Sequence, residues 1–537
     1  MGNSLQKPKG ADLPSPNLLD RAIAFVAPEK AAQRYRARVA VTLFQQMYGG
    51  GYIAGRNDRK ALQDYNPRAK SADADVNPGL TTMRARSRDL AMNAPLATGA
   101  LNTTVTSTVG SGMAAQPSID REVIGLSEDE ASAWERRARK IWRYWAERPC
   151  ADFEHELTFY DLQSLGFRSA LENGDVLAVK RWKERTGDPF GTRCQLIEAD
   201  RVSNPHFQMD TQELAQGVET TEDGDVVRYW VQDGHPGDHL FGRLGYQWAP
   251  VPSHDPQGDR VAWLLYDKRR IGQRRGVPYL APVVEPLKQL ERYSEAELMA
   301  AVISALFTVF IKSEDGETTL PGVVPDEDDD RRGDVSLGPG TIAELLSTDE
   351  VEVVNPNRPN QQFDAFVTAI YRQVAVGLEL PYEILIKHFQ SSYSASRGAI
   401  LEAWKFFRGR RGWLDTHFCT PFYEAVISEA VGRGWLEAPG FFDDPFLRAA
   451  YLGVHWTGDA MPQIDPLKEA RASKLMVDEG FSTREREAMA LNGTDWEENH
   501  QQQVKEERMR REAGFGLAPD ETAPSPDPET REDVEAA

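Results

Sequence analysis

Apolar residues recur every three to four positions in several long stretches of the chain, which is the pattern of amphipathic helices. The strongest example covers residues 127–147, where Ser127 stands at the expected start and Glu130 three residues later, a capping-box arrangement. The apolar face of this predicted helix carries Trp134, Ile141 and Trp145. Other stretches with helical spacing are 20–48, 79–109, 286–312, 361–380, 398–432 and 466–512.

Between residues 165 and 270 the pattern changes to short runs that are rich in β-branched and aromatic residues. Four such runs, separated by Gly, Asp and Pro turns, are "ENGDVLAVKRW", "CQLIEADRV", "VVRYWVQD" and "RVAWLLYD". We therefore expect a β-rich subdomain inserted in an otherwise helical chain. The predicted fold class is α+β and mainly helical.

Two of the predicted helices flank a short excursion of different composition. The first runs from Pro286 through Lys312, which corresponds to about 40 Å of helix. The second covers 361–380 and ends before Pro381, because proline cannot continue a helix. Residues 313–360 between them are acidic and rich in Gly and Pro, with short apolar pieces such as "TIAELLS" and "VEVV". The simplest topology is an antiparallel helix pair with a small α/β domain at its far tip.

A polar loop of small residues, Lys387–Gly398 ("KHFQSSYSASRG"), separates this helix pair from the next long helix. Gly409, Gly412 and Pro421 predict that the long helix bends. The two ends of the chain have no apolar periodicity. Residues 1–20 are rich in Pro, Gly and Lys and are predicted to be flexible, and residues 513–537 are rich in Pro, Glu and Asp and are predicted to be disordered.

Length and charge narrow the possible functions. The 537 residues, 40% of them hydrophobic, suffice for three or four domains of ordinary size. The formal net charge of −21 disfavours tight, sequence-independent DNA binding, because such binding depends on cations that neutralise phosphates. Weak contact with sliding DNA stays compatible with this charge.

Cysteine usage and apolar runs indicate the compartment. Cys150, Cys194 and Cys419 are widely spaced and form no CxxC pair, as in a reducing compartment. The N-terminus lacks an apolar signal core, and the apolar run Leu298–Ile311 is too short to span a bilayer. The sequence predicts a soluble, cytoplasmic chain with no membrane partner and no cofactor.

Candidate enzymatic chemistry is sparse. Neither a GxxxxGK[ST] phosphate loop nor a GxSxG nucleophile elbow occurs in the sequence. Metal-ligand residue types gather in Asp233–His239 ("DGHPGDH"), with His254 nearby, so a metal-dependent hydrolase or nuclease using this region is the enzymatic alternative. Pro236 and Gly237 keep the two histidines of this segment off one helix face, which favours a solvated hairpin loop.

Two acidic groups also have metal-binding potential. Glu198 and Asp200 have no evident His or Lys partner, and their segment is interpreted as a strand ending in a turn in which Asp200 pairs with Arg201. The run "DEDDDRR" lacks the glycine-hinged spacing of a calcium loop, which favours a solvated surface that docks another protein. This run consists of Asp326, Glu327, Asp328, Asp329, Asp330, Arg331 and Arg332.

Basic clusters occupy residues 268–275 and 408–411 of this acidic chain. Contact with nucleic acid and salt bridges to acidic neighbours, in the same chain or in another copy, are both open. The negative net charge favours salt bridges. The cations of the first cluster are Lys268, Arg269, Arg270, Arg274 and Arg275.

Several segments resemble the portal proteins of tailed bacteriophages, in particular the lambda-like group. "GVPYLAPVVEPLKQLERYSEAEL" (Gly276–Leu298) is similar to the entry into that family's first stem helix, and "LPYEILIKHFQSSYSASRGAILEAWKFF" (Leu380–Phe407) is similar to its passage from the second stem helix through the tunnel loop. "HWTGDAMPQIDPLKEARA" (His455–Ala472) resembles the segment near its crown, and "NAPLATGALNTTVTSTVGSGM" and "IEADRVSNP" resemble its wing. The matches keep the family's order and are spread over residues 40–480.

The resemblance implies a portal fold with a wing, a two-helix stem, an α/β clip, a tunnel loop, a long bent helix and a helical crown. The implied boundaries are a flexible arm at 1–20, the wing with its β-rich subdomain at 21–280, stem helices at 281–312 and 361–385, the clip at 313–360, the tunnel loop at 386–397, the bent wing helix and return segment at 398–465, the crown at 466–512 and a disordered acidic tail at 513–537.

The resemblance also implies a function without catalysis. Such proteins form a ring, expected here to be dodecameric, at one capsid vertex, and double-stranded DNA is packaged and ejected through its channel. An acidic wall lets DNA slide, because it repels phosphate. The expected DNA contacts in the tunnel loop are Lys387, His388, Gln390, Ser391, Ser392 and Arg397.

Further partners follow from the same resemblance. The acidic run at 326–332 is expected to dock the terminase large subunit and then the head–tail adaptor protein, and the basic cluster at 268–275 to form intersubunit or wing–stem salt bridges. Contacts with the major capsid and scaffold proteins are also expected. The expected location is the virion, with the host cytoplasm during assembly.

Overall fold

The structure is a computed structural model that describes residues 27–48, 64–238, 246–305, 309–313, 349–353, 363–389, 392–461 and 465–513, with single positions between 23 and 62 and at 515. The chain divides into two compact units, Met1–Ser71 and Ala72–Ala537. The first unit contains the helix α2 (Pro28–Tyr48), in agreement with the helical pattern at 20–48. The predicted flexible arm at 1–20 lies outside the described residues, as do nearly all of the tail and most of the clip.

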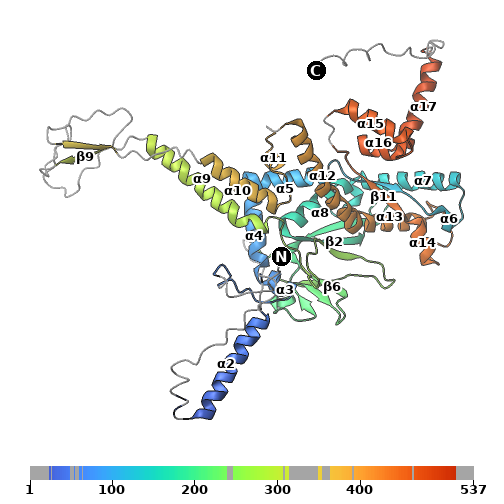
Figure 1. Cartoon of the computed structure of the whole chain (residues 1–537). Coiled ribbons are helices and arrows are strands. Elements are labelled where there is room, and N and C mark those ends of the chain that lie inside the picture. Colours follow the sequence, from blue (N-terminus) through green and yellow to red (C-terminus); the bar gives the residue numbers. More distant parts are fainter. Residues whose placement is uncertain are drawn as a thin grey trace, which may run out of the picture. The chain divides into compact units, whose positions relative to one another are not determined.

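The second unit combines many helices with short strands (Figure 1). Its α-helices are α3 (Ala72–Val76), α4 (Leu80–Asn93), α5 (Pro95–Thr108), α6 (Arg121–Ile124), α7 (Glu128–Ala146), α8 (Phe159–Asn173), α9 (Val284–Ala305), α10 (Phe363–Gly377), α11 (Tyr382–Leu385), α12 (Tyr393–Leu414), α13 (Thr420–Gly432), α14 (Pro445–Tyr451), α15 (Pro466–Asp478), α16 (Arg484–Asn492) and α17 (Trp496–Glu512). Its strands are β1 (Ala114–Pro117), β2 (Asp175–Trp182), β3 (Thr192–Glu198), β4 (Leu214–Ala215), β5 (Val218–Thr220), β6 (Val226–Gln232), β7 (Trp248–Pro252), β8 (Ala262–Tyr266), β9 (Val309–Ser313), β10 (Asp349–Val353) and β11 (Val454–Thr457). This composition confirms the predicted mainly helical α+β class.

The β-rich subdomain consists of two antiparallel sheets, with strand orders β3-β2-β8 and β4-β5-β6-β7. All four predicted runs form strands, namely β2, β3, β6 and β8. The predicted start of this region at residue 165 is wrong, because residues 165–173 complete the helix α8. Thr158 and Asp161 form a capping box that starts α8, and its apolar residues follow helical spacing.

The strand β2 joins two hydrophobic cores, since successive side chains of a strand point to opposite faces. Val176 and Ala178 belong to a large core built mainly from helices, whereas Leu177 and Val179 pack with residues of the second sheet. Both faces of β2 are therefore buried, which explains why its sequence has an apolar run without alternation.

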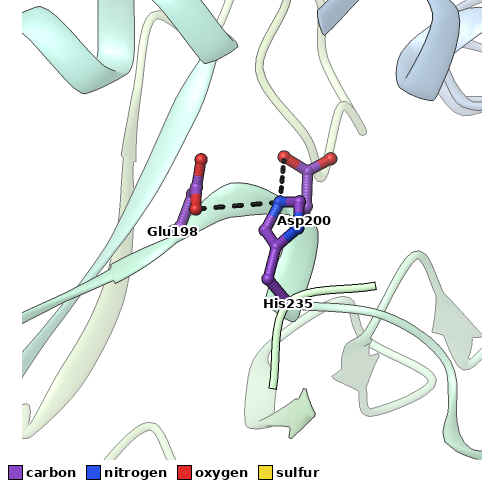
Figure 2. A group of neighbouring side chains, drawn as sticks. All are labelled: Glu198, Asp200 and His235. Carbon is purple, nitrogen blue, oxygen red and sulfur yellow. Dashed lines mark ion pairs between the residues drawn. The ribbon is translucent and has the colours of Figure 1, made fainter. Parts of the chain in front are cut away.

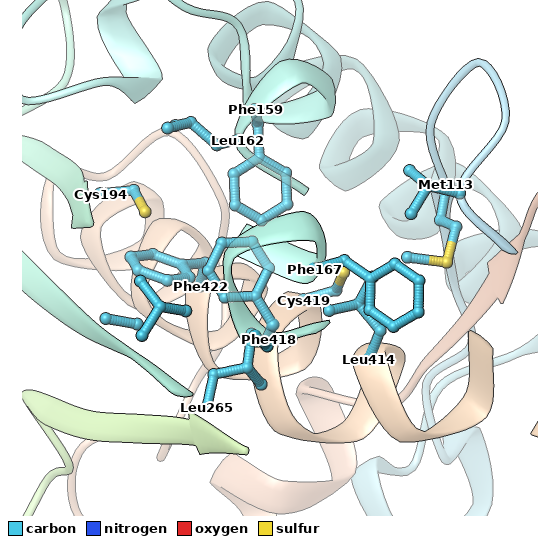
Figure 3. Packing of buried hydrophobic residues seen from close by; sticks show 14 of the residues in the cluster. Met113, Phe159, Leu162, Phe167, Cys194, Leu265, Leu414, Phe418, Cys419 and Phe422 are labelled. Atoms are coloured by element: carbon cyan, nitrogen blue, oxygen red, sulfur yellow. The ribbon is translucent and has the colours of Figure 1, made fainter. Parts of the chain in front are cut away.

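Aromatic rings fill the large core (Figure 3). The rings of Phe159 in α8 and Phe418 are stacked with centroids 5.5 Å apart, and Phe422 in α13 packs against both. Trp145 in α7 is buried as predicted, as is Trp134, whereas Ile141 is only partly buried. Trp142 takes the buried place instead, so the apolar face of α7 is rotated by one residue at this point.

The helical stretch predicted at 79–109 is two helices, α4 and α5, which meet at Ala94. Ala94 has extended backbone angles because Pro95 disfavours a helical conformation in the residue before it. Gly110 and Gly112 have positive φ angles after the second helix, as expected of residues that stop a helix.

The helices α9 and α10 form the predicted antiparallel pair (Figure 1). Tyr293 in the middle of α9 packs on Phe366 near the start of α10, with ring centroids 4.8 Å apart. At the other end, Gly377 lies so close to Val283, just before α9, that a Cβ atom at Gly377 would come within 2.8 Å of it. The start of α9 therefore lies beside the end of α10.

The predicted continuation of the first helix to Lys312 is wrong. The helix α9 ends at Ala305, and β9 pairs with β10 in an antiparallel ribbon in which Val309 is opposite Val353. The sequence of β9, "VFIKS", is rich in β-branched and aromatic residues, which suit a strand better than a helix end. The residues Val351–Val353 of the short apolar piece "VEVV" lie in β10, which confirms a β component in the excursion.

The long helix after the loop bends at one place. α12 and α13 are joined by a π-helical turn at Asp415–Cys419, directly before Pro421. Proline lacks an N–H group and its ring clashes with the carbonyl four residues earlier, and a π turn relieves this clash. Gly409 and Gly412, which were also expected to bend the helix, lie within α12.

The C-terminal helices α15, α16 and α17 carry no buried residues. Their location confirms the helical pattern predicted at 466–512. Among the described residues, no helix has the length and apolarity needed to cross a membrane.

Candidate functional site

The candidate DNA-contacting loop follows α11, and its conformation is set by that helix end. Lys387 has a positive φ of 54°, and the His388 N–H donates to the Glu383 carbonyl over 3.0 Å. This is the six-to-one hydrogen bond of a Schellman motif, in which a left-handed residue closes the helix. Lys387, His388 and Phe389 are all exposed. The loop thus presents two polar side chains and one apolar ring to solvent.

The predicted loop boundary at residue 397 is wrong, because α12 begins at Tyr393. Ser392 caps this helix by accepting from the Ala395 N–H over 3.4 Å, so it has a local structural role. Arg397 lies in the first turns of α12 and pairs with Glu469 of α15 at 3.1 Å. Gln390 and Ser391 lie outside the described residues. Lys387 and His388 are therefore the predicted loop residues that the structure places on an exposed turn.

The helix pair carries an exposed apolar stripe. On α9, Leu298, Met299 and Val302 are each about half exposed or more, and on α10 Phe366 is 49% exposed. Large apolar side chains at helical spacing on a surface are typical of a protein–protein contact. The acidic run at 326–332, which was predicted to dock other proteins, lies outside the described residues.

The basic cluster at 268–275 is tied to nearby carboxylates of the same chain. Arg270 pairs with Asp75 and Arg274 with Asp73, both at 2.6 Å. Arg269 pairs with Asp267 at 3.3 Å, while Lys268 is exposed and has no ion pair among the described residues. These partners lie within residues 73–267 and not in α9 or α10, so a role between subunits or towards the stem stays a prediction.

Arg275 has a different environment from the rest of the cluster, because it is fully buried. It binds Asp175 through two nitrogen atoms at 2.8 and 2.9 Å, and Arg84 of α4 binds the same carboxylate at 2.9 Å. Burial by itself would raise the pKa of Asp175, but the two guanidinium groups and the Gly276 N–H hold the pKa below its usual value. This group fixes α4, β2 and the segment before α9 to one another.

The structure brings together an acidic cluster that the sequence did not reveal (Figure 2). The Nε2 atom of His235 lies 3.7 Å from both Glu198 Oε2 and Asp200 Oδ2, and these three side chains are near enough to one another to hold a metal ion. The interpretation that Glu198 and Asp200 have no histidine partner is thus wrong. Residues far apart in sequence meet here because β3 ends beside the loop after β6, which the spacing alone does not show.

The donor set fits a salt-bridged cluster better than a metal centre. Arg88 binds both carboxylates, with a 3.1 Å contact to Glu198, and so neutralises part of their charge. The Nδ1 atom of His235 accepts from the Gly237 N–H over 3.0 Å, which leaves the proton of the neutral ring on Nε2, the atom that faces the carboxylates. A protonated Nε2 cannot ligate a metal. Asp200 pairs with Arg88 and not with Arg201, whose Nε donates to the Gln232 carbonyl.

The enzymatic alternative in the Asp233–His254 region gains no common centre from the structure. Asp233 accepts from the Gln247 N–H, and His254 contacts Ser253 through Nδ1. His239 lies outside the described residues. Only His235 of this segment contributes to the acidic cluster described above, among the residues that the structure describes.

Comparison with known families identifies the class of protein. A family model described as phage portal protein, lambda family, matches residues 58–411. This range includes the β-rich subdomain, the helix pair, the exposed turn and most of α12. The chain belongs to the lambda family of phage portal proteins.

Individual relatives extend the match beyond this range. The chain is 26% identical over 491 residues to portal protein B of Escherichia phage lambda, covering 87% of this chain and 91% of the relative. It is 27% identical over 490 residues to the portal protein of Escherichia phage N15, covering 87% and 90%. A chain in the neck of a native gene transfer agent particle is similar at a TM-score of 0.42 and 11% identity, over 80% of this chain and 97% of that chain.

Proposed function

We propose that copies of this portal protein assemble into a ring whose channel carries double-stranded DNA into and out of a tailed-phage capsid. The observation that carries the proposal is the order of elements in a chain of this family: a β-rich wing, an antiparallel helix pair that leads to a small ribbon, an exposed turn, and a long bent helix. In this proposal α9 and α10 form the stem, β9 and β10 belong to the clip, residues 386–392 form the tunnel loop, and α15–α17 form the crown.

Electron microscopy of the purified full-length chain tests the ring. End-on views are expected to show a closed ring with a central hole, and class averages give the subunit number, which we propose to be twelve. Head-to-tail contacts close into such a ring when the rotation between neighbours divides a full turn. A chain that stays monomeric at micromolar concentration, or forms open filaments, would contradict the proposal.

The channel contact is proposed to lie at Lys387 and His388, whose side chains are exposed on the turn after α11. The sequence also predicted DNA contacts at four other residues of this loop, namely Gln390, Ser391, Ser392 and Arg397. Of these, Ser392 and Arg397 have local partners that limit their availability to DNA. The net charge of −21 supports a wall that lets DNA slide, with few cations in weak contact with phosphate.

The clip is proposed to dock the terminase large subunit during packaging and the head–tail adaptor protein afterwards. The support is the acidic run "DEDDDRR" between two helices of the stem pair. Charge reversal at Asp328–Asp330 is expected to weaken capture of the terminase subunit by purified rings, with intact rings by microscopy as the control. Unchanged capture would show that the acidic run is not the docking surface. Major capsid and scaffold proteins are further proposed partners, and the virion is the proposed location.

We also propose that this chain has no catalytic activity, in keeping with a family whose members are structural. The competing proposal is a metal-dependent hydrolase or nuclease in the Asp233–His254 region. Incubating purified rings with duplex DNA and Mg²⁺ or Mn²⁺ separates the two. Cleavage that disappears in His235→Ala and His254→Ala variants would support the enzyme, and intact DNA at all metal concentrations supports the structural role.

A further inference from the structure

A groove beside α7 is a feature of the described surface that the portal function leaves unexplained. Its volume is about 370 Å³, and its walls are Ile141 and Tyr144 of α7 together with Pro189, Phe190 and Trp435. The rings of Phe190 and Trp435 are nearly perpendicular, with centroids 5.1 Å apart, and form an aromatic floor in the groove. Aromatic and proline side chains that line a shallow groove are the kind of surface on which proline-rich segments dock.

Cations surround this groove. Arg137 and Lys140 of α7 line it, and Arg148 covers the Tyr144 ring at 3.5 Å from its centroid. All three residues are exposed, and none of them forms an ion pair with any described residue. A patch of unpaired cations is unexpected in a chain with a net charge of −21, since acidic side chains are abundant. The patch is therefore suited to a negatively charged ligand.

The geometry points to a segment of this same protein, from its own copy or a neighbouring copy, as the ligand of the groove. We propose that the groove formed by Arg137, Lys140, Ile141, Tyr144, Pro189 and Trp435 binds the acidic, proline-rich C-terminal segment 516–537. This segment, "GLAPDETAPSPDPETREDVEAA", contains seven acidic residues, one basic residue and four prolines. The other terminal segment, 1–22, has three basic residues and two acidic ones, so charge does not match it to this groove.

The C-terminal helix is attached next to the groove. Arg139 of α7 pairs with Asp495 at 2.8 Å, and Arg143 pairs with Glu498 in the first turn of α17 at 3.0 Å. Arg143 lies three residues after Lys140, so these two side chains are neighbours on the surface of α7. The start of α17 is thus held on the helix that carries the cationic rim.

The chain after α17 is long enough for the segment 516–537 to reach back to the groove beside α7. The 17 residues of α17 lead away over about 25 Å, at 1.5 Å per residue. The 22 residues of 516–537 span up to about 70 Å when extended, at roughly 3.3 Å per residue. The segment therefore reaches the groove of its own chain or of a neighbouring copy. Alternating prolines at 524, 526 and 528 favour the extended polyproline conformation, which loses little entropy on docking.

Binding of a synthetic peptide with the sequence 516–537 tests the proposal. The peptide is titrated into the protein that ends at residue 515, with fluorescence anisotropy as the readout. We expect saturable binding, at least tenfold weaker affinity for Arg137→Glu/Lys140→Glu, and weaker apparent affinity for the full-length chain, whose own tail competes. Replacing Pro524, Pro526 and Pro528 of the peptide by alanine is expected to weaken binding at unchanged charge. The variant side chains are exposed, so circular dichroism should match the parent.

Zero-length carbodiimide cross-linking of the full-length chain provides an independent measurement. A cross-link between the Lys140 amine and a carboxylate within 520–535 is expected in mass spectrometry, and mixed isotope labelling tells a tail of the same copy from a neighbour's tail. Lys140→Arg keeps the charge, so it should bind the peptide but lose the cross-link. Absent peptide binding at millimolar concentration, binding unaffected by the charge reversal, or cross-links from Lys140 only to other acidic segments would each overturn the proposal.

Discussion

Asp175 is the residue on which three distant parts of the chain converge. Its carboxylate has no exposed surface and binds Arg84, Arg275 and the Gly276 N–H. Arg275 also donates to the carbonyls of Ala199 and Val202, so its donors are satisfied as burial requires. A buried charge with complete partners stabilises a fold mainly because the loss of one partner leaves an uncompensated charge.

Arg275→Met is expected to destabilise the protein by about 3–5 kcal/mol, because it leaves Asp175 with only one cation in a buried site. Urea denaturation followed by circular dichroism measures this change in the free energy of unfolding. Lys405→Met is the matched control: Lys405 pairs with Glu402 on the surface, both about 70% exposed, and a change below about 1 kcal/mol is expected there. Equal effects of the two substitutions would contradict this assignment.

The pH dependence at Asp175 has a definite sign. Its pKa is lower in the folded chain than in the unfolded chain, so the group contributes stability above its unfolded pKa of about 3.9 and loses this contribution as the pH falls towards the folded pKa. The difference in unfolding free energy between wild type and Asp175→Asn is therefore expected to be largest near neutral pH. It should shrink below about pH 4. A constant difference across this range would contradict the expectation.

Asp415, in the π-helical turn, is expected to give stability the opposite pH dependence from Asp175. Burial raises its pKa to about 7, and Arg411 only partly offsets this effect. A raised pKa means that the stability present at low pH is lost as the pH rises to the folded value, here between about 4 and 7. Asp415→Asn should therefore match wild type near pH 4 and be more stable at pH 8 by up to about 4 kcal/mol. Thermal unfolding at both pH values measures this, and a less stable variant at pH 8 would refute it.

At the scale of single elements, helix ends are set by local chemistry. Ser127 accepts from the Glu130 N–H, and the Glu130 carboxylate accepts from the Ser127 N–H in return, so the start of α7 is closed by its own side chains. The π-helical turn before Pro421 and the break before Pro95 are similar local responses to proline. Such features depend on neighbours in sequence, which is why the start of α7 was predicted correctly from the sequence.

Ser127→Ala is expected to destabilise the protein by about 1 kcal/mol, because loss of the serine hydroxyl leaves the Glu130 N–H without its hydrogen-bond acceptor. Ser132→Ala, within the same helix, is the control with the opposite sign, because alanine has the higher helix propensity at an interior position. Urea denaturation of both variants measures the change in the free energy of unfolding that each substitution causes. Loss of stability in both, to the same extent, would show that the serine hydroxyl at the cap has no special role.

At the scale of the whole molecule, the surfaces that stay apolar in a single chain are the ones expected to meet other copies. The helix α9 ends in such a stripe, with Leu298 65% exposed. The helix pair is held together by Tyr293, which packs on Phe363 and on the partly exposed Phe366 of α10. The stripe is therefore free to pack against the stem of a neighbouring subunit in the proposed ring.

Leu298→Glu is expected to prevent ring closure while leaving the subunit folded, because it places a charge in an interface that excludes water. Ala296→Glu introduces the same charge on nearly the opposite side of α9 and should assemble normally. Sedimentation velocity distinguishes rings from free subunits, and circular dichroism checks the fold. Normal rings from Leu298→Glu would rule out this stripe as the contact.

The proposed channel contact is tested in the assembled particle. Lys387→Ala/His388→Ala removes the polar side chains of the exposed turn, and we expect particles with less than full-length DNA or with poor retention of it. Genome length and retention are measured by gel electrophoresis of encapsidated DNA. Lys405→Ala, a surface lysine of α12 outside the turn, is the control. Particles that package and retain full-length DNA normally would show that these side chains are dispensable.

Local pattern was sufficient for much of this protein. Helical spacing predicted α2, α7, α10 and the helical region that contains α15–α17. Runs of β-branched residues predicted β2, β3, β6 and β8, because both signals arise from neighbouring residues. The same signals were misleading where a partner elsewhere decides the outcome. Val309–Ser313 extends the apolar pattern of α9, yet it forms a strand because Asp349–Val353 is available to pair with it.

The candidate site residues also fall into two groups, those that local sequence predicts and those that depend on contacts between distant segments. The sequence by itself determined the family and the presence of a short polar turn at Lys387 and His388 between two helices, since these follow from residues that are contiguous along the chain. Only the tertiary structure decided that Arg275 is a buried partner of Asp175 while its neighbour Arg274 is partly exposed, and that His235 joins Glu198 and Asp200. Charge–charge contacts between distant segments depend on how strands and helices pack, and no spacing rule in the sequence encodes that packing.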